Sequence, residues 1–288
     1  GRDDDLLPAG PAMTDTPAPA TGTAQAGDGT GSRTARAWRH GWVVETAAVG
    51  AAVLIHMVRP VTWRRSVRRE FVHFMGIAGV DIVPTVVIAA ILAGLGLLFQ
   101  GLWWLEQVGQ GQPVRNIIHT VLVREVAPLA VGLLSIGHSG LIIVNELSRM
   151  RADGRLRALD SQGIDPFVLF VVPRVVALSV SLFCLTMLFA AIAPAAGLLT
   201  ALVLGVTNLS FSAILLSILG TIGTQGYAVL PLKSLGIGFA IGTVCCVTAM
   251  AEPSNPNRSG DDARLAVGFF RSLFLMFLFS GTISVLVR

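Results

Sequence analysis

Residues 145–166, NELSRMRADGRLRALDSQGIDP, form a short charged stretch between two long apolar segments. Residues 126–144 before it and residues 175–232 after it contain no Asp, Glu, Lys or Arg. Because charges are costly in hydrocarbon, a charged insert between two such segments is expected to lie at a membrane surface. Its arginines favour the cytoplasmic surface, since cytoplasmic loops carry an excess of Lys and Arg. These arginines are Arg149, Arg151, Arg155 and Arg157. A membrane protein with one such helix and no soluble domain is expected to respond to a partner there.

The composition of the whole chain is that of an integral membrane protein. Of its residues 53% are hydrophobic and only 13% are charged, against about 25% charged residues in soluble domains. The net charge of +4 comes from basic residues that cluster beside apolar segments. Such a distribution indicates how the chain is oriented in the membrane, and it does not indicate a phosphate-binding surface. No nucleic-acid partner is therefore expected. The cysteines lie in apolar segments without metal-ligand spacing, and they are expected to serve as small packing residues, as are Gly238 and Gly242. The cysteines are Cys184, Cys245 and Cys246.

The first 75 residues precede the first clear membrane span. Residues 1–38 are rich in Gly, Ala, Thr, Pro and Asp and lack apolar periodicity, which predicts a disordered tail. Residues 39–75 are predicted to form interfacial helices, because 42–58 is apolar but short and 59–70 is basic with an aromatic anchor. The alternative is that 42–58 is a genuine span.

Residues 76–288 are predicted to form a transmembrane domain with about five spanning helices, and the N-terminus is predicted to be cytoplasmic. The spans are expected at 82–105, 117–144, 167–185 or beyond, 234–251 and 265–287. Residues 175–232 are too long for one helix and are expected to contain a reversal. The candidate helix breakers there are Pro194, Gly197, Gly205 and Asn208. The predicted fold class is therefore all-α and integral to the membrane.

The sequence contains no motif for catalysis or nucleotide binding. Lys233, the only lysine, is predicted to lie on the outer side. It does not follow the glycine pattern of a P-loop. Any ATP is therefore expected to bind a partner subunit, and no cofactor is expected on this chain. Arg124 and Glu125 lie near the outer end of the second span. They either pair with each other at the helix end or form a polar gate to a substrate cavity. Glu146 is either simply interfacial or the partner of a nearby arginine. His138, between small residues, is expected to be packed and hydrogen-bonded rather than to relay protons.

The charged insert has the pattern of a short amphipathic helix over about 153–165. Apolar Leu156, Leu159 and Ile164 are opposite the charged Arg155, Arg157 and Asp160. Gly163 is predicted to end this helix, and Asp165 with Pro166 is predicted to cap the next one. Force applied to the helix would then pass directly to the third span. Residues 172–174, VPR, predict a kink and an arginine that snorkels to the surface.

Several short motifs occur in order and at a recognisable spacing. They are Arg124-Glu125-x-x-Pro128, Gly137-x-x-Gly140, Glu146-Leu147-x-x-Met150, Ala158-Leu159-x-x-x-Gly163-x-Asp165-Pro166 and Val172-Pro173-Arg174. Together, over about residues 59–287, they resemble the MlaE/YrbE family, the permease subunits of lipid-transporting ABC systems that are associated with MCE proteins.

This resemblance implies a permease subunit in the bacterial inner membrane that forms a homodimer, with a lipid cavity where the two copies meet. Each copy would bind a separate ABC ATPase through its short cytoplasmic helix. An MCE-domain protein on the periplasmic side would help to pass phospholipid or a related lipid between the inner membrane and the outer envelope. The residues expected to couple to the ATPase are Glu146, Arg151, Arg155, Arg157, Leu159, Asp160, Gly163, Asp165 and Pro166. Those expected to line or gate the lipid cavity are Arg124, Glu125, Pro128 and His138.

The sequence departs from the family pattern in its charges. His138 stands where the family usually has arginine, and Gly154, Arg155 and Arg157 stand where the coupling helix usually carries acidic residues. The reversed charge predicts a partner ATPase with a more acidic groove. Two other functions compete with lipid transport: a membrane scaffold without a substrate path, and a stand-alone secondary transporter. The second is disfavoured because the sequence has no pair of matched broken helices.

Overall fold

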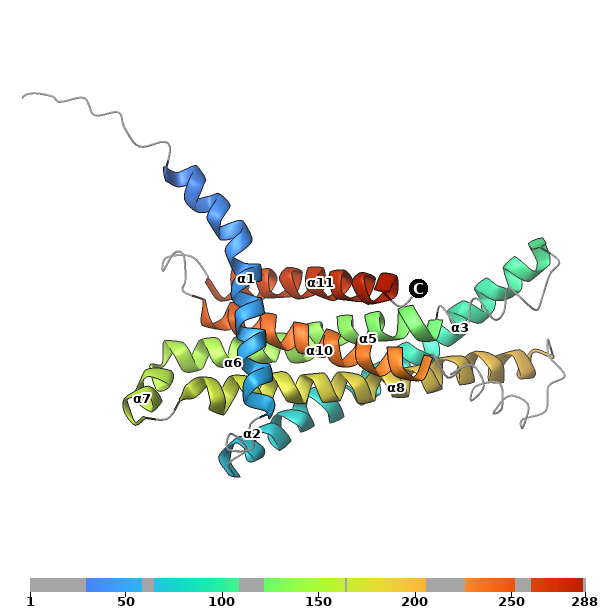
Figure 1. Ribbon diagram of the computed structural model, residues 1–288. Coiled ribbons are helices and arrows are strands. Elements are labelled where there is room, and N and C mark those ends of the chain that lie inside the picture. The colour runs from blue at the N-terminus through green and yellow to red at the C-terminus, as the bar shows by residue number, and fades with distance from the viewer. Residues whose placement is uncertain are drawn as a thin grey trace, which may run out of the picture. The chain divides into compact units, whose positions relative to one another are not determined.

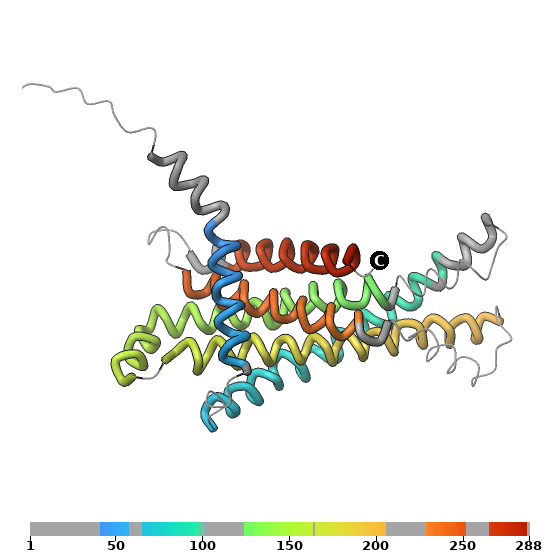
Figure 2. Tube along the Cα trace, in the orientation of Figure 1, coloured from blue at the N-terminus to red at the C-terminus, as the bar shows by residue number. Residues whose placement is uncertain are grey.

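The structure is a computed structural model that describes residues 30–58, 65–108, 122–163, 165–205, 226–251 and 260–286. Every regular element in these ranges is a helix (Figures 1 and 2). In chain order they are α1 (Thr30–Val58), α2 (Arg65–Met75), η2 (Gly76–Val80), α3 (Val83–Val108), η3 (Leu122–Val126), α5 (Ala127–Ser135), η4 (Ile136–Gly140), α6 (Leu141–Ala152), α7 (Arg155–Ser161), η5 (Phe167–Val171), α8 (Val172–Val203), α10 (Gly226–Met250) and α11 (Gly260–Leu286). The η elements are π-helical turns. α1 begins inside the range predicted as a disordered tail, and residues 1–29 lie outside the described residues.

Within the part of the chain that the structure describes, five helical runs are long and apolar enough to cross a membrane, in agreement with the predicted number of spans. They are Arg65–Leu97, Arg124–Ala152, Phe167–Val203, Val229–Met250 and Leu265–Leu286. The chain is therefore an all-α, multi-pass membrane protein. α7 lies at one end of these runs and the C-terminal end of α11 lies at the other (Figure 1). We refer to these as the α7 end and the opposite end.

The first span begins earlier than the sequence predicted. α2, η2 and α3 form one helical run from Arg65 to Leu97, so the helix predicted at the membrane surface over residues 65–75 continues directly into the first span. The arginines of α2 are exposed, whereas Val67 and Phe74 are buried. Because the charged turns lie at the end of the span, the apolar part still has the length needed to cross hydrocarbon.

The third span is one uninterrupted helix, so the prediction that Pro194 and Gly197 break it is wrong. Close packing against α3 supports this part of α8: a Cβ added to Gly197 would lie 3.0 Å from the carbonyl oxygen of Gly94. Neighbouring helices and small residues of this kind allow proline inside membrane helices. The chain leaves the helical conformation at Gly205, whose φ of +68° is left-handed. Asn208 lies outside the described residues.

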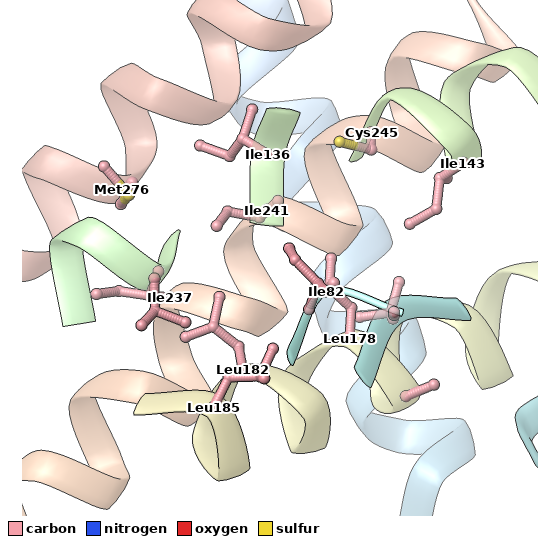
Figure 3. Packing of buried hydrophobic residues seen from close by; sticks show 14 of the residues in the cluster. Ile82, Ile136, Ile143, Leu178, Leu182, Leu185, Ile237, Ile241, Cys245 and Met276 are labelled. Carbon is pink, nitrogen blue, oxygen red and sulfur yellow. The ribbon is translucent and has the colours of Figure 1, made fainter. Parts of the chain in front are cut away.

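α8 contacts α2, α3 and α10 and occupies the centre of the packed core. Figure 3 shows Leu182 of α8 close to Ile237 of α10, and Leu178 of α8 close to Ile82. The contact between α8 and α10 depends on small residues. A Cβ added to Gly238 would lie 2.7 Å from the Cα of Ser179, a separation that real side chains do not reach. The predicted packing role of this glycine is confirmed.

Residues 43–58 of α1 belong to the same compact unit as the spans. A Cβ added to Gly50 would lie 3.3 Å from the ring of Phe239 on α10, so the two helices are in close contact. In Figure 1 this part of α1 crosses α10 instead of running alongside it. The apolar stretch Gly41–Met57 is also too short to be one of the five spans. Both observations favour the predicted interfacial position over a sixth span.

Candidate functional site

α7 is a seven-residue helix between two left-handed glycines, Gly154 with φ +72° and Gly163 with φ +74°. Glycine adopts this conformation without the steric cost that a Cβ brings. The chain can therefore turn sharply on both sides of α7. The amphipathic helix that the sequence predicted over 153–165 is present at Arg155–Ser161.

The surface of α7 has the predicted two-sided character. Leu156 and Leu159 are half-buried, and Ile164 lies outside the described residues. Arg155 comes within 3.8 Å of Asp153, but both side chains are more than half exposed, so this pair contributes little to stability. The charged side chains of α7 are exposed: Arg155, Arg157 and Asp160.

A capped corner connects α7 to the third span. The Oδ1 atom of Asp165 accepts a hydrogen bond of 2.9 Å from the backbone N–H of Phe167. Pro166, which follows Asp165, has no N–H to leave unpaired in the first turn. The predicted cap is thus confirmed, and the corner leads through η5 directly into α8.

Arg174 does not reach the surface, contrary to the prediction that it snorkels. Its side chain is completely buried, and its Nη2 atom lies 3.0 Å from Oε1 of Glu146 and 3.2 Å from Oε1 of Glu70. The guanidinium also lies over two aromatic rings, at 5.5 Å from Phe170 and 5.9 Å from Phe74. One cation therefore connects α2, α6 and α8 near the α7 end. Residues 172–174 form the first turn of α8, directly after the π-helical η5.

Two of the residues predicted to couple to an ATPase have structural partners away from α7. Glu146 pairs with Arg174, so the nearby arginine considered from the sequence belongs to the third span. The Nη1 atom of Arg151 donates a hydrogen bond to the carbonyl oxygen of Met250, at the C-terminal end of α10. Cations at this position stabilise a helix because its C-terminal carbonyls carry partial negative charge.

A second polar cluster lies at the opposite end. The Nζ atom of Lys233 on α10 lies 2.5 Å from Oε2 of Glu125 on η3 and 2.9 Å from Oγ of Ser284 on α11. Ser284 in turn donates to Oε1 of Glu125 at 2.9 Å. Glu125 is thus paired with Lys233 and not with its neighbour Arg124. Lys233, predicted to lie on the outer side, is only 1% exposed and joins three elements.

The other two predicted gate residues follow Glu125 along the second span. Pro128 is buried in the first turn of α5. His138 lies in the π-helical η4, half-buried, with its Nδ1 atom 3.5 Å from Oγ of Ser139. It is about 20 Å along the helix from Glu125, at 1.5 Å per residue. The structure therefore brings Glu125 together with Lys233, but it does not gather the four predicted gate residues into one site.

Glu70, Lys233 and Ser284 were not predicted from the sequence as members of these clusters. A signal was present for two of them, because acidic or basic residues at the ends of spans need partners. The partner was not identifiable, since Glu70 lies 104 positions from Arg174 and Glu125 lies 108 positions from Lys233. Within the described residues, no group of three or more His, Cys, Asp or Glu side chains could hold a metal ion. The arrangement is suited to holding helices and binding a partner.

Comparison with known proteins identifies related sequences. Residues 71–286 match the family model described as Permease MlaE. A "Probable ABC transporter permease protein" of Rickettsia felis is 24% identical over 161 residues, which cover 56% of this chain and 59% of that protein. The "Intermembrane phospholipid transport system permease protein MlaE" of Haemophilus influenzae is 27% identical over 129 residues, covering 44% of this chain and 49% of that protein. The chain thus aligns with about half the length of these curated relatives.

Proposed function

The chain belongs to the MlaE permease family, and on this premise we propose that it is the membrane-spanning subunit of an ABC-type transporter for phospholipid or a related lipid. The family match carries the proposal, because it covers most of the chain. The name of the Haemophilus influenzae relative supports phospholipid as the substrate class. In this proposal ATP is hydrolysed by a separate subunit, an MCE-domain protein acts on the other side of the membrane, and two copies of this chain surround the lipid.

The ATPase is proposed to bind at α7. This helix presents Arg155 and Arg157 to solvent and half-buries Leu156 and Leu159, which suits an acidic groove with an apolar floor. It is also well placed to pass on a movement, because the capped start of the third span at Asp165 follows it after a short connection. A displacement of α7 would reach α8 through this corner and η5.

Charge reversal on α7 tests this proposal. We expect the wild-type chain to retain an ATPase subunit during purification. The variant Arg155→Glu with Arg157→Glu should lose both this subunit and lipid-stimulated ATP hydrolysis, because the exposed cations would become anions that face an acidic groove. Arg155→Lys with Arg157→Lys is the matched control, since it keeps the charge and should retain most activity. Normal ATPase binding by the charge-reversed variant would refute docking at α7.

The cluster at the opposite end is proposed to gate the lipid path. Lys233 neutralises Glu125, so the half-buried Arg124 next to it is, among the residues that the structure describes, a cation available for a lipid phosphate at this end of the spans. Arg124→Gln should then reduce the transport rate at low lipid concentration, measured in vesicles that contain the reconstituted complex, because the variant lacks the charge that binds phosphate. Arg65→Gln is the matched control at the α7 end, and an equal loss there would count against a gate at Arg124.

The proposed topology has the N-terminus and α7 in the cytoplasm, with the chain in the inner membrane of a bacterium. A cysteine at Arg157 tests it, because this side chain is exposed. In a variant with Cys184→Ser, a membrane-impermeant maleimide should label Arg157→Cys only after cells are lysed, while Cys245 and Cys246 stay protected by burial. Labelling of intact spheroplasts would place α7 outside and overturn the topology.

A further inference from the structure

We propose that Arg174 is a positioning residue for energy coupling: through Glu146 and Glu70 it fastens the two helices that flank α7, together with the first span, into one body that moves when α7 is pushed. This inference rests on the proposed function, and it concerns three residues that lie away from the ATPase-binding surface itself. We call Arg174, Glu70 and Glu146 the arginine latch.

The position of the latch in the chain is its first support. Glu146 lies midway along α6, before α7, and Arg174 lies in the first turn of α8, after α7. Their contact of 3.0 Å therefore closes the base of a helical hairpin whose tip is α7. Glu70, at 3.2 Å from the same nitrogen, adds the first span to that hairpin.

The connection that the latch spans is its second support. Between α7 and α8 the chain passes through the turn at Gly163 and the π-helical η5. A π-helical turn is a departure from regular α-helix and is often found at functional positions. Without a cross-connection, a push on α7 could be absorbed by bending at η5. With the latch closed, α6 and α8 are held at the level of η5, and the displacement is passed to three spans.

The charge balance of the latch is its third support, and it also shows how to test the latch. A buried ion pair is a weak source of stability, because desolvating the ions offsets most of their attraction. The latch contains two carboxylates for one cation, so removing either carboxylate leaves a balanced pair, whereas removing Arg174 leaves two unpaired carboxylates. Glu146→Gln and Glu70→Gln are therefore the variants expected to fold.

The geometry further predicts a conservative rescue. Both carboxylates contact the same nitrogen, Nη2, while Nε and Nη1 of Arg174 are buried and have no hydrogen-bond partner among the described residues. A lysine ammonium supplies one nitrogen with three donors, so Arg174→Lys can preserve both contacts. A role that depended on the bidentate fork of arginine would not be rescued in this way.

The experiment measures ATP hydrolysis and lipid movement separately in vesicles that contain the complex with its ATPase. We expect Glu146→Gln to bind the ATPase and hydrolyse ATP, while the lipid moved per ATP falls by about tenfold, the order expected for one lost hydrogen bond to a charged group. Arg174→Lys should stay close to wild type. Glu45→Gln, which removes an exposed carboxylate of α1 outside the latch, is the matched control and should match wild type.

A distance measurement keeps the latch testable without transport. Spin labels at Asn145→Cys on α6 and at the native, exposed Cys184 on α8 report the separation of the two helices. The distance distribution should broaden in Glu146→Gln but not in Glu45→Gln. If both the distribution and the lipid moved per ATP are unchanged in Glu146→Gln, the latch is refuted. If the wild-type complex moves no lipid while Glu146→Gln still broadens the distribution, the proposed function fails and the latch stands as a structural connection.

Discussion

The cluster of Glu125, Lys233 and Ser284 predicts an asymmetric response to loss of charge. Glu125→Gln leaves the Lys233 ammonium, 1% exposed, with neutral partners only. Breaking a buried pair in this way costs about 3–5 kcal/mol of unfolding free energy. Lys233→Met leaves a carboxylate that is 35% exposed and still accepts the hydrogen bond of Ser284. Because water reaches that carboxylate, we expect the smaller cost of about 1–2 kcal/mol.

The combined variant separates pairing from the individual losses. With Glu125→Gln and Lys233→Met together, no charge is left unpaired, so the cost should fall short of the sum of the single costs by at least about 1 kcal/mol. Buried cysteines supply the assay, since Cys245 and Cys246 are at most 1% exposed and become reactive to a thiol dye only on unfolding. Unfolding is followed in detergent with Cys184→Ser as the background in every variant.

The order of the two single variants is the decisive outcome. If Lys233→Met destabilises the protein as much as Glu125→Gln, burial of the ammonium does not control the energetics of the cluster. Additive costs in the double variant would show that the contact of 2.5 Å between Nζ and Oε2 contributes no coupling. Ser284→Ala is the control for lost hydroxyl contacts, and its cost should be smaller than that of either charge change.

Two further variants test the packing of the spans and the corner after α7. Gly238→Ala should destabilise the protein by about 1–3 kcal/mol through overpacking, because its Cβ would meet the Cα of Ser179 at 2.7 Å. Gly96→Ala is the control, since nothing lies within 4 Å of the added Cβ, and it should be neutral or stabilising in the same dye assay. Equal effects of the two substitutions would contradict the close contact at Gly238. Asp165→Ala should lower the free energy of unfolding by about 0.5–2 kcal/mol, because it removes the hydrogen bond that caps Phe167. Asp165→Asn keeps an oxygen acceptor and should retain most of that stability. Equal losses in the two variants would argue against capping.

The number of spans and the local form of α7 were predictable because both follow from patterns within a few turns of chain. Apolar runs long enough to cross hydrocarbon identify spans, and the spacing of Leu156 and Leu159 against the charged positions identifies an amphipathic helix. The capped start at Asp165 and Pro166 is similarly local. In each case the residues that decide the structure are neighbours in sequence, so one sequence contains the needed information.

The incorrect predictions concern positions where a distant segment changes the outcome. Pro194 looked like a helix breaker, yet α8 continues through it because it packs closely against α3, as the contact between Gly94 and Gly197 shows. Arg174 looked like a snorkelling residue, yet carboxylates on two other helices hold it inside. Neither partner can be assigned from hydropathy or spacing, because those patterns do not record which helices are neighbours.

Charged residues near the two ends of the spans hold helices together, and the packed helices differ in this from helices with mostly exposed surfaces. Ion pairs tie helices together at both ends, through Arg174 near α7 and through Lys233 at the opposite end. Between these ends, α8 and α10 meet through contacts too close for a side chain at Gly238. In α10, 72% of the spanning window is buried, compared with 17% in α11. α8 and α10 therefore form the packed centre, and under the proposed function a displacement that enters α8 from α7 would pass through these tight contacts before it reached the exposed surface of α11.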